Sequence, residues 1–334
     1  TVVDAYLASD GLLTPTSSLV SGYDFHYDSS LEIANQFTRG TGRPAETLLS
    51  PSTQSYQQPD TWDADALRDK LFSSRHDLIY LAGHFSDGGL LAADYASNLE
   101  AAELLQSTVP LTGSLVISPG CHSGYNTVDG DSIDGLTQQP DWAQVFARKG
   151  ATLIAGTGYQ YGDTQFIQFA EQLYVNLSQQ LRVGTGPVAL GPALAAAKQR
   201  YLINAAQIRG IDQKTVAIAS LYGLPMMRVN MPGERLQLEG DPSIVSAPGA
   251  VSGNPFGLQS ADVSIGAATT EQTVPITQLS DGAERSASYL RGSDGVVASP
   301  AEPVLPLEQN NVAVQNRLLR GIDALYGTPT PYIA

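Results

Sequence analysis

The sequence predicts an α/β fold with a mostly parallel central sheet, followed by a β-rich C-terminal segment. From residue 1 to about 233, short apolar runs alternate with helical periodicity, which is typical of parallel strands joined by helices. From residue 234 to 334, Gly, Ser, Pro and Thr dominate, apolar and polar residues alternate, and helical periodicity is absent until 311–325. These two patterns predict two domains, 1–233 and 234–334.

Core strands are expected where short apolar runs stop at turn residues, because such runs are typical of buried strands. These runs are at 18–23, 78–82, 115–118, 151–155 and 216–219. Helices are expected where apolar residues recur at helical spacing or follow a capping residue. The expected helices are 30–37 (capped by Ser30), one capped by Asp63, 97–105, 142–148, 166–181 and 192–208.

The composition limits the classes of partner. A net charge of −15 on 334 residues argues against non-specific binding to nucleic acid phosphates. No apolar run approaches the roughly 20 residues of a membrane helix, so we expect no membrane insertion. A single cysteine excludes an internal disulfide and a multi-cysteine metal site.

That cysteine stands in a favourable place for chemistry. Cys121 follows the apolar run 115–118 after a Pro-Gly break, and His84 follows the run 78–82 after one glycine. In open α/β sheets, reactive groups collect just past the carboxyl ends of the strands. A neighbouring imidazole can take the proton of a thiol and make it a nucleophile. The sequence therefore predicts a Cys121–His84 pair, against the alternative of a buried cysteine and a hydrogen-bonded structural histidine.

Two other histidines fit this role less well. His122 directly follows Cys121, and adjacent residues of an extended chain point to opposite faces. His76 lies at the other end of its strand. A phosphate-binding cysteine loop would need an arginine near Thr127, and a zinc site would need more ligands than one cysteine supplies.

Three blocks carry a family resemblance: Leu-Ile-Tyr-Leu-Ala-Gly-His-Phe-Ser at 78–86, Ile-Ser-Pro-Gly-Cys at 117–121 and Tyr-Gly-Leu-Pro at 222–225. In this order they resemble the histidine block, the cysteine block and the strand-closing motif of the caspase-like (clan CD) cysteine peptidases, most closely the gingipain family. The resemblance covers roughly 19–229. It implies a three-layer caspase-like fold.

The resemblance also implies a mechanism. Cys121 would form the acyl-enzyme, His84 would protonate the leaving amine, and the backbone N–H groups of Cys121 and Phe85 would hold the oxyanion. The family usually has glycine where this chain has Phe85, and phenylalanine adopts a positive φ only with strain. A distorted oxyanion hole is therefore an open alternative. Gly120 replaces a usual alanine, a change from which we expect little effect, and Leu224 stands where the family often has aspartate.

In gingipain-like enzymes an acid in the substrate pocket selects Arg or Lys before the cut bond. The candidate acids here are Asp24, Asp28 and Asp163, and Tyr159 is expected to line the pocket. Each acid has a competing role as a turn or helix-capping residue.

A further acidic stretch contains Asp129, Asp131 and Asp134 on a glycine-bearing loop, which suits Ca²⁺ but lacks the full EF-hand spacing. A solvated acidic loop is the more common outcome. We expect no obligatory cofactor, with Ca²⁺ as an optional ligand.

The predicted function is a cysteine endopeptidase acting on polypeptides, secreted or at a bacterial cell surface, and part of a larger multidomain chain. One alternative is a catalytically impaired peptidase-fold domain that serves as a binding module. A third keeps the thiol chemistry for transpeptidation or for hydrolysis of a small amide.

Overall fold

A computed structural model describes residues 2–51, 61–126, 139–164, 166–205, 208–237, 244–246, 252–253, 259–260, 268–277, 284–293, 295–299, 302–307 and 311–313. The chain divides into two compact units, Thr1–Gln237 and Leu238–Ala334. The sequence patterns change at residue 233, but the next residues pair with the first unit: the Glu234 N–H donates to Arg39 O at 2.8 Å and the Leu236 N–H to Arg182 O at 2.9 Å.

The first unit is built on a six-stranded sheet in the order β11-β9-β8-β4-β2-β3. Every neighbouring pair is parallel except β11 with β9. The prediction of a mostly parallel α/β sheet is therefore confirmed. Its strands are β2 (Ser18–Gly22), β3 (Glu46–Leu49), β4 (Leu78–Leu81), β8 (Leu115–Ser118), β9 (Thr152–Gly156) and β11 (Ala219–Tyr222).

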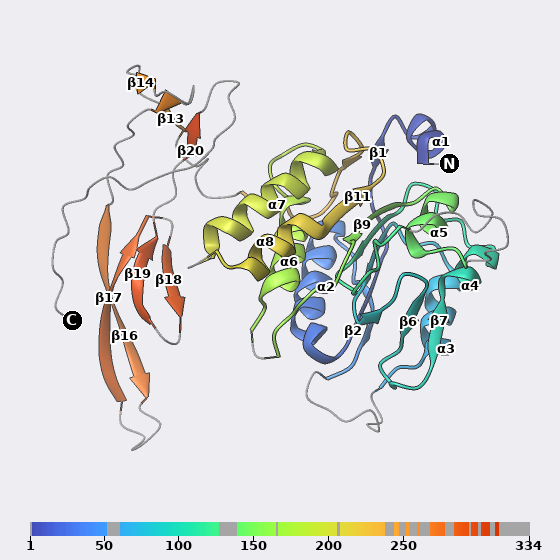
Figure 1. The fold of residues 1–334 in the computed structure, drawn as a ribbon, viewed down its shortest axis with the longest axis horizontal. Coiled ribbons are helices and arrows are strands. Elements are labelled where there is room, and N and C mark those ends of the chain that lie inside the picture. Colours follow the sequence, from blue (N-terminus) through green and yellow to red (C-terminus); the bar gives the residue numbers. More distant parts are fainter. Residues whose placement is uncertain are drawn as a thin grey trace. The chain divides into compact units, whose positions relative to one another are not determined.

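Helices cover both faces of this sheet, which gives the predicted three layers (Figure 1). Alternate strand residues enter opposite cores: Leu78 and Tyr80 of β4 pack on one face, and Ile79 and Leu81 on the other. The first face is covered by α2 (Tyr27–Thr41), α6 (Phe169–Gln180), α7 (Leu190–Asn204) and α8 (Gly210–Ile218). The second is covered by α3 (Ala64–Ser73), α4 (Ala101–Gln106) and α5 (Trp142–Arg148).

Some element boundaries agree with the sequence analysis. Asp63 caps α3 by accepting the Ala66 N–H at 2.8 Å, and α5 spans the expected residues. Others were wrong. The helix that we expected to begin at Ser30 begins at Tyr27, and Ser30 is a buried residue within it.

Two further boundaries were wrong because tertiary pairing replaced the local pattern. The stretch expected to open a helix at 97–100 instead pairs as β7 (Asn98–Glu100) with β6, and the capping box is formed by Glu100 and Glu103. The expected last strand at 216–219 is the end of α8, and the strand begins at Ala219, where it pairs with β9.

The described part of the first unit also contains two small sheets. The antiparallel sheet β5-β6-β7 contains β5 (His84–Phe85) and β6 (Gly89–Leu91) and continues from the end of β4. The other small sheet joins β1 (Leu12–Leu13), β12 (Arg228–Val229) and β10 (Val188–Ala189). A short helix α1 (Val2–Ala8) precedes them, and a 3₁₀ helix η1 (Asp24–His26) follows β2.

The described residues of the second unit are mostly strands, as predicted. The largest sheet among them is antiparallel and joins β16 (Thr269–Thr277), β17 (Glu284–Gly292), β18 (Gly295–Ser299) and β19 (Glu302–Leu307). Short pairs link β13 (Ile244–Ser246) to β20 (Asn311–Ala313), and β14 (Ser252–Gly253) to β15 (Gln259–Ser260). Residues 311–313, where we expected a helical pattern to begin, form strand β20. Residues 314–334 lie outside the described part.

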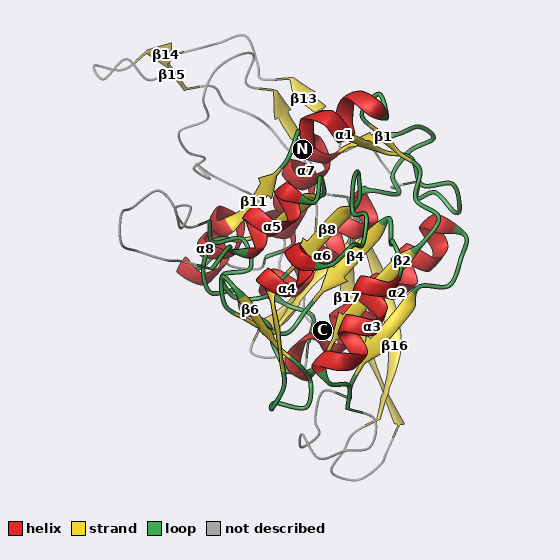
Figure 2. Cartoon of the chain, turned by 90° about the vertical axis from the view of Figure 1, so that its right-hand side faces the viewer, coloured by secondary structure: helices red, strands yellow, loops and turns green. Residues whose placement is uncertain are grey.

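Figure 2 gives a second view of the helices and strands, turned by 90°. Across the described residues, we find no helix with the length and apolarity that a membrane span requires.

Candidate active site

The two predicted catalytic residues leave the same edge of the central sheet. Strands β4 and β8 are parallel neighbours, with Tyr80 paired to Ile117. His84 and Cys121 each follow four positions after these paired residues. Adjacent parallel strands therefore deliver an imidazole and a thiol to one end of the sheet.

The segments that carry these two residues touch through Phe85. A Cβ at position 120 would overlap the Phe85 ring and lie 2.8 Å from the Phe85 Cβ. The same ring packs against Trp142 with centroids 5.8 Å apart. The expectation that Gly120 matters little was wrong, because no side chain fits at 120 while Phe85 occupies this position.

Hydrogen bonds from Gln160 hold the turn that contains Cys121. The buried Gln160 side chain donates from Nε2 to the carbonyl oxygens of Ser118 at 3.1 Å and Gly120 at 2.9 Å. The half-buried Cys121 thiol donates to the Gln160 carbonyl at 3.4 Å. The thiol is thus held at the surface of the turn, between the cysteine segment and the 157–163 loop.

The backbone around Cys121 suits an oxyanion site. The N–H groups of Gly120, His122, Ser123 and Gly124 donate to Ser118 Oγ, Gly158 O, Gly120 O and Gly156 O. Within the described part of the chain, no such bond is recorded for the Cys121 N–H. Phe85 lies in β5 without a positive φ, so the strain expected from replacing glycine there is absent.

His84 is held by three polar contacts. Its Nε2 lies 3.0 Å from Asp24 Oδ2 and 3.2 Å from the Tyr95 hydroxyl, and its backbone N–H donates to the Tyr23 hydroxyl at 2.9 Å. Tyr95 also donates to Asp24 Oδ2. The hydrogen bond from His84 lowers the pKa of the Asp24 carboxyl, with Tyr95 acting in the same direction.

Both ring contacts of His84 are made by Nε2. Although both side chains are described, no hydrogen bond joins the His84 ring to the Cys121 thiol. The side chain of His84 is 38% exposed, so substrate and water can reach it. The ring of His122, the residue after Cys121, packs edge-on against Tyr159 of the 157–163 loop at 4.5 Å.

Sequence reasoning named Asp24, but as a pocket acid rather than a histidine partner. Asp24 follows β2, which neighbours β4, so the same sheet-edge argument that paired Cys121 with His84 could have found it. Tyr95 had no such signal, because it arrives from the loop between β6 and β7.

The remaining pocket candidates lie in different environments. Asp28 is exposed in the first turn of α2. Asp163 accepts the Phe166 N–H at 3.1 Å, and its own N–H donates to Glu171 at 2.9 Å. Glu171 is buried beneath this loop, and burial raises the pKa of its carboxyl to about 7.

The 157–163 loop presents an aromatic surface with a cation. Tyr159 is 59% exposed and Tyr161 is 40% exposed. The Lys214 ammonium lies 5.5 Å from the Tyr159 ring centre and 4.9 Å from that of Tyr161, and it donates to the Tyr161 hydroxyl at 3.2 Å. Both tyrosines flank Gln160, the residue whose carbonyl contacts the thiol.

The candidate calcium ligands Asp129, Asp131 and Asp134 lie outside the residues that the structure describes. In the described ranges, no group of three or more His, Cys, Asp or Glu side chains is arranged to hold a metal ion.

Several solved structures resemble this chain, and three of them are described here. The Arg-specific cysteine proteinase gingipain R is 12% identical, with a TM-score of 0.46 over 94% of this chain and 72% of that one. A protease is 14% identical, with a TM-score of 0.41 over 93% and 66% of the two chains. Caspase-1 from Spodoptera frugiperda is 11% identical, with a TM-score of 0.36 over 67% and 94%.

No protein-family model and no curated protein sequence matches the chain. Two of these structures, gingipain R and caspase-1, bear the names of the groups that the sequence blocks resemble. Because their TM-scores are below 0.5, we base no residue role and no activity on them.

Proposed function

We propose that this chain is a cysteine endopeptidase that hydrolyses peptide bonds through Cys121 and His84. The observation that supports this most directly is the His84–Asp24 contact of 3.0 Å beside the cysteine turn. A carboxylate on one ring nitrogen fixes the tautomer and orientation of an imidazole and leaves the other nitrogen for proton transfer.

In the proposed reaction, Nδ1 of His84 takes the thiol proton and the Cys121 sulfur attacks the scissile carbonyl carbon. The oxyanion accepts hydrogen bonds from the backbone N–H groups of Cys121 and Phe85. The C–N bond then breaks as His84 gives its proton to the leaving amine. Water, deprotonated by His84, attacks the thioester and releases the acid and the thiol. Asp24 stays ionised and stabilises the imidazolium, consistent with its lowered pKa.

The substrate in this proposal is a polypeptide, and no cofactor takes part. A basic residue before the cut bond would pair with Asp28 or Asp163, since the Asp24 carboxylate is bonded to His84 and Tyr95. We also propose that the protein acts outside a bacterial cell, as a secreted or surface protein within a longer chain.

A panel of fluorogenic peptides with Arg, Lys, Asp, Phe or Ala before the cut bond tests the activity. Cys121→Ala and His84→Gln should each lower kcat by at least about a thousand-fold. His122→Gln is the matched control, because this neighbouring imidazole points toward Tyr159 and should leave kcat within about two-fold. Cleavage at the full rate by Cys121→Ala would refute the proposal.

One observation favours a second candidate, a binding module that retains the fold. The Cys121 thiol and the His84 imidazole, both described, share no hydrogen bond. A thiol with no activating base reacts slowly with iodoacetamide at neutral pH. Alkylation of Cys121 no faster than that of a free cysteine would favour this candidate, and amide products formed with an added amine would instead indicate transpeptidation.

A further inference from the structure

From the contacts around His84 we infer that Tyr95 is a positioning residue. Its hydroxyl holds the Asp24 carboxylate against Nε2 of His84. The proton then stays on Nε2, and Nδ1 remains available to accept the proton of the thiol. This inference rests on the proposed function of His84, and it assigns no direct contact between Tyr95 and substrate.

One carboxylate oxygen is shared by two donors. Asp24 Oδ2 lies 3.0 Å from His84 Nε2 and also accepts from the Tyr95 hydroxyl, which is itself 3.2 Å from that nitrogen. A carboxylate held by an imidazole alone can rotate about its Cβ–Cγ bond, whereas a second donor on the same oxygen opposes this rotation. The Tyr95 ring also packs edge-on against the rings of His84, at 5.5 Å, and Tyr23, at 5.8 Å.

The hydroxyl of Tyr95 is suited to donate. Partial burial and the neighbouring Asp24 charge raise its pKa above the ordinary value, so the proton stays on the oxygen. Two further rings pack edge-on against His84, those of Tyr23 at 5.7 Å and Phe25 at 5.6 Å. The buried His26 packs on Phe25, and burial lowers its pKa to about 3, so it stays neutral. Asp24 is therefore the charge that governs which nitrogen of His84 carries the proton.

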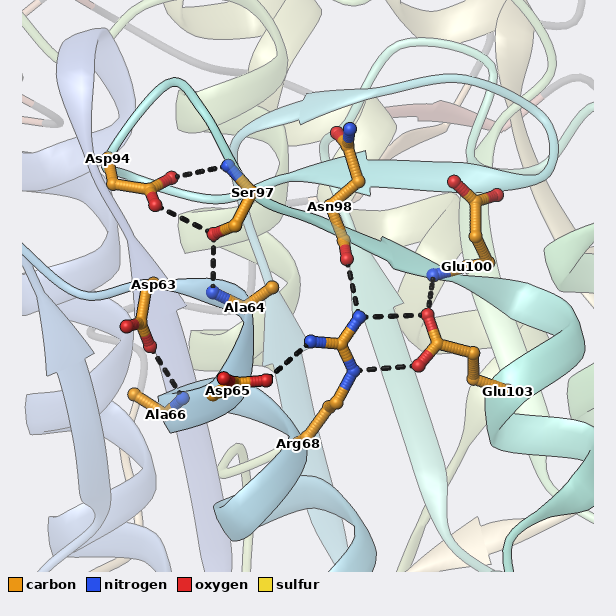
Figure 3. A network of polar contacts seen from close by, with 10 residues as sticks. All are labelled: Asp63, Ala64, Asp65, Ala66, Arg68, Asp94, Ser97, Asn98, Glu100 and Glu103. Atoms are coloured by element: carbon orange, nitrogen blue, oxygen red, sulfur yellow. Dashed lines mark hydrogen bonds and ion pairs between the residues drawn. The ribbon is translucent and has the colours of Figure 1, made fainter.

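The backbone of Tyr95 is held in an unusual conformation. Its φ is 55°, a left-handed value that residues with a Cβ adopt only under constraint. The constraint is the preceding aspartate, whose Oδ1 accepts the N–H groups of Ala96 and Ser97 at 3.0 Å each. Asp94 Oδ2 also accepts the Ser97 hydroxyl at 2.7 Å (Figure 3).

This turn is anchored to helix α3 rather than to the hairpin alone. Ser97 Oγ accepts the N–H of Ala64, the first residue of α3, at 2.8 Å (Figure 3). Further along α3, Arg68 donates to Glu103 at 2.7 and 2.9 Å and to Asn98 O at 2.6 Å. The loop that carries Tyr95 is thus attached to α3 through the residues that directly follow Tyr95, as a positioning element requires.

The test compares Tyr95→Phe with Tyr201→Phe in the full chain. Tyr201 is the matched control because it also donates to an aspartate, Asp212, at 2.7 Å, but between α7 and α8. For Tyr95→Phe we expect kcat to fall about ten-fold with KM changed by less than about two-fold, the loss of one hydrogen bond to a charged group. Tyr201→Phe should leave both constants unchanged.

A spectroscopic readout separates positioning from a structural effect and from any failure of the peptidase proposal. Nitrogen-15 NMR of the four histidines, with His84 assigned by His84→Gln, should show His84 protonated at Nε2 in the wild type. Tyr95→Phe should shift part of the population to the Nδ1–H form, and Ser97→Ala should do so to a smaller extent because the tyrosine backbone is then less constrained.

The inference is overturned if His84 keeps the same nitrogen signals in Tyr95→Phe, or if kcat falls no further than in the Tyr201 control. If Tyr95→Phe lowers both the melting temperature and kcat but leaves the tautomer of His84 unchanged, Tyr95 has a structural role instead. Should Cys121→Ala retain cleavage, the peptidase proposal fails, but the NMR comparison still decides the role of Tyr95.

Discussion

A single methyl group added at position 120 should destabilise the first unit measurably. In Gly120→Ala the new Cβ would overlap Cγ and Cδ2 of Phe85 and lie 2.8 Å from its Cβ. Phe85 cannot withdraw easily, because its ring packs against Trp142 and its backbone pairs with Leu90 in the small sheet. Overpacking of this kind costs about 1–3 kcal/mol.

A double-mutant cycle isolates this contact. Phe85→Gly removes the three nearest atoms, so the added methyl group then no longer overlaps the Phe85 side chain. Gly120 has no positive φ, so in this background alanine should stabilise the chain by about 0.4–1 kcal/mol, through the entropy of the unfolded state. The sign of the Gly120→Ala effect should therefore reverse between the two backgrounds.

Urea titration followed by tryptophan fluorescence measures both effects. The two tryptophans, Trp62 and Trp142, both belong to the first unit, so the signal reports on its unfolding. In thermal unfolding followed by the same signal, Gly120→Ala should lower the midpoint temperature by about 2–10 °C. Gly88→Ala is the control, since the nearest atom to its Cβ is Pro140 O at 4.0 Å.

The reasoning is refuted if Gly120→Ala costs no more than Gly88→Ala, or if its cost is the same with and without the Phe85 side chain. Either result would mean that the contact between the histidine and cysteine segments does not depend on the absence of a side chain at 120.

Two further predictions concern buried charged groups. The pKa of Glu171 is raised to about 7 from its ordinary 4.5, so the folded chain binds this proton more tightly and stability is lost as pH rises through this range. The stability of Glu171→Gln relative to wild type should therefore increase between pH 5 and 8 by up to about 3 kcal/mol, and a pH-independent difference in urea titrations would contradict this. Arg182 is fully buried and donates to Gln36 and, at 3.1 Å, to Glu234 O. Arg182→Met should cost about 1–3 kcal/mol by leaving acceptors unpaired, whereas the exposed Arg228→Met should cost less than about 0.5 kcal/mol, and equal costs would refute the assignment.

Much of the central sheet could be read from the sequence because its strands are buried on both faces. Short continuous apolar runs bounded by turn residues, such as 78–82 and 115–118, are typical of buried parallel strands, and their place and type were predicted correctly. The 97–100 stretch was misjudged because a good capping pattern competes there with hairpin pairing, and local sequence cannot weigh a partner strand that lies elsewhere in the chain.

What the sequence by itself determined is the sheet and the common edge at which Cys121 and His84 emerge, since both follow from periodicity and from the direction of parallel strands. Only the tertiary structure decided which groups surround them. Asp24 and Tyr95 are 71 residues apart in the chain, and Phe85 meets Gly120 across two strands. Such contacts depend on the directions of individual side chains after the layers have packed, and no local pattern encodes those directions.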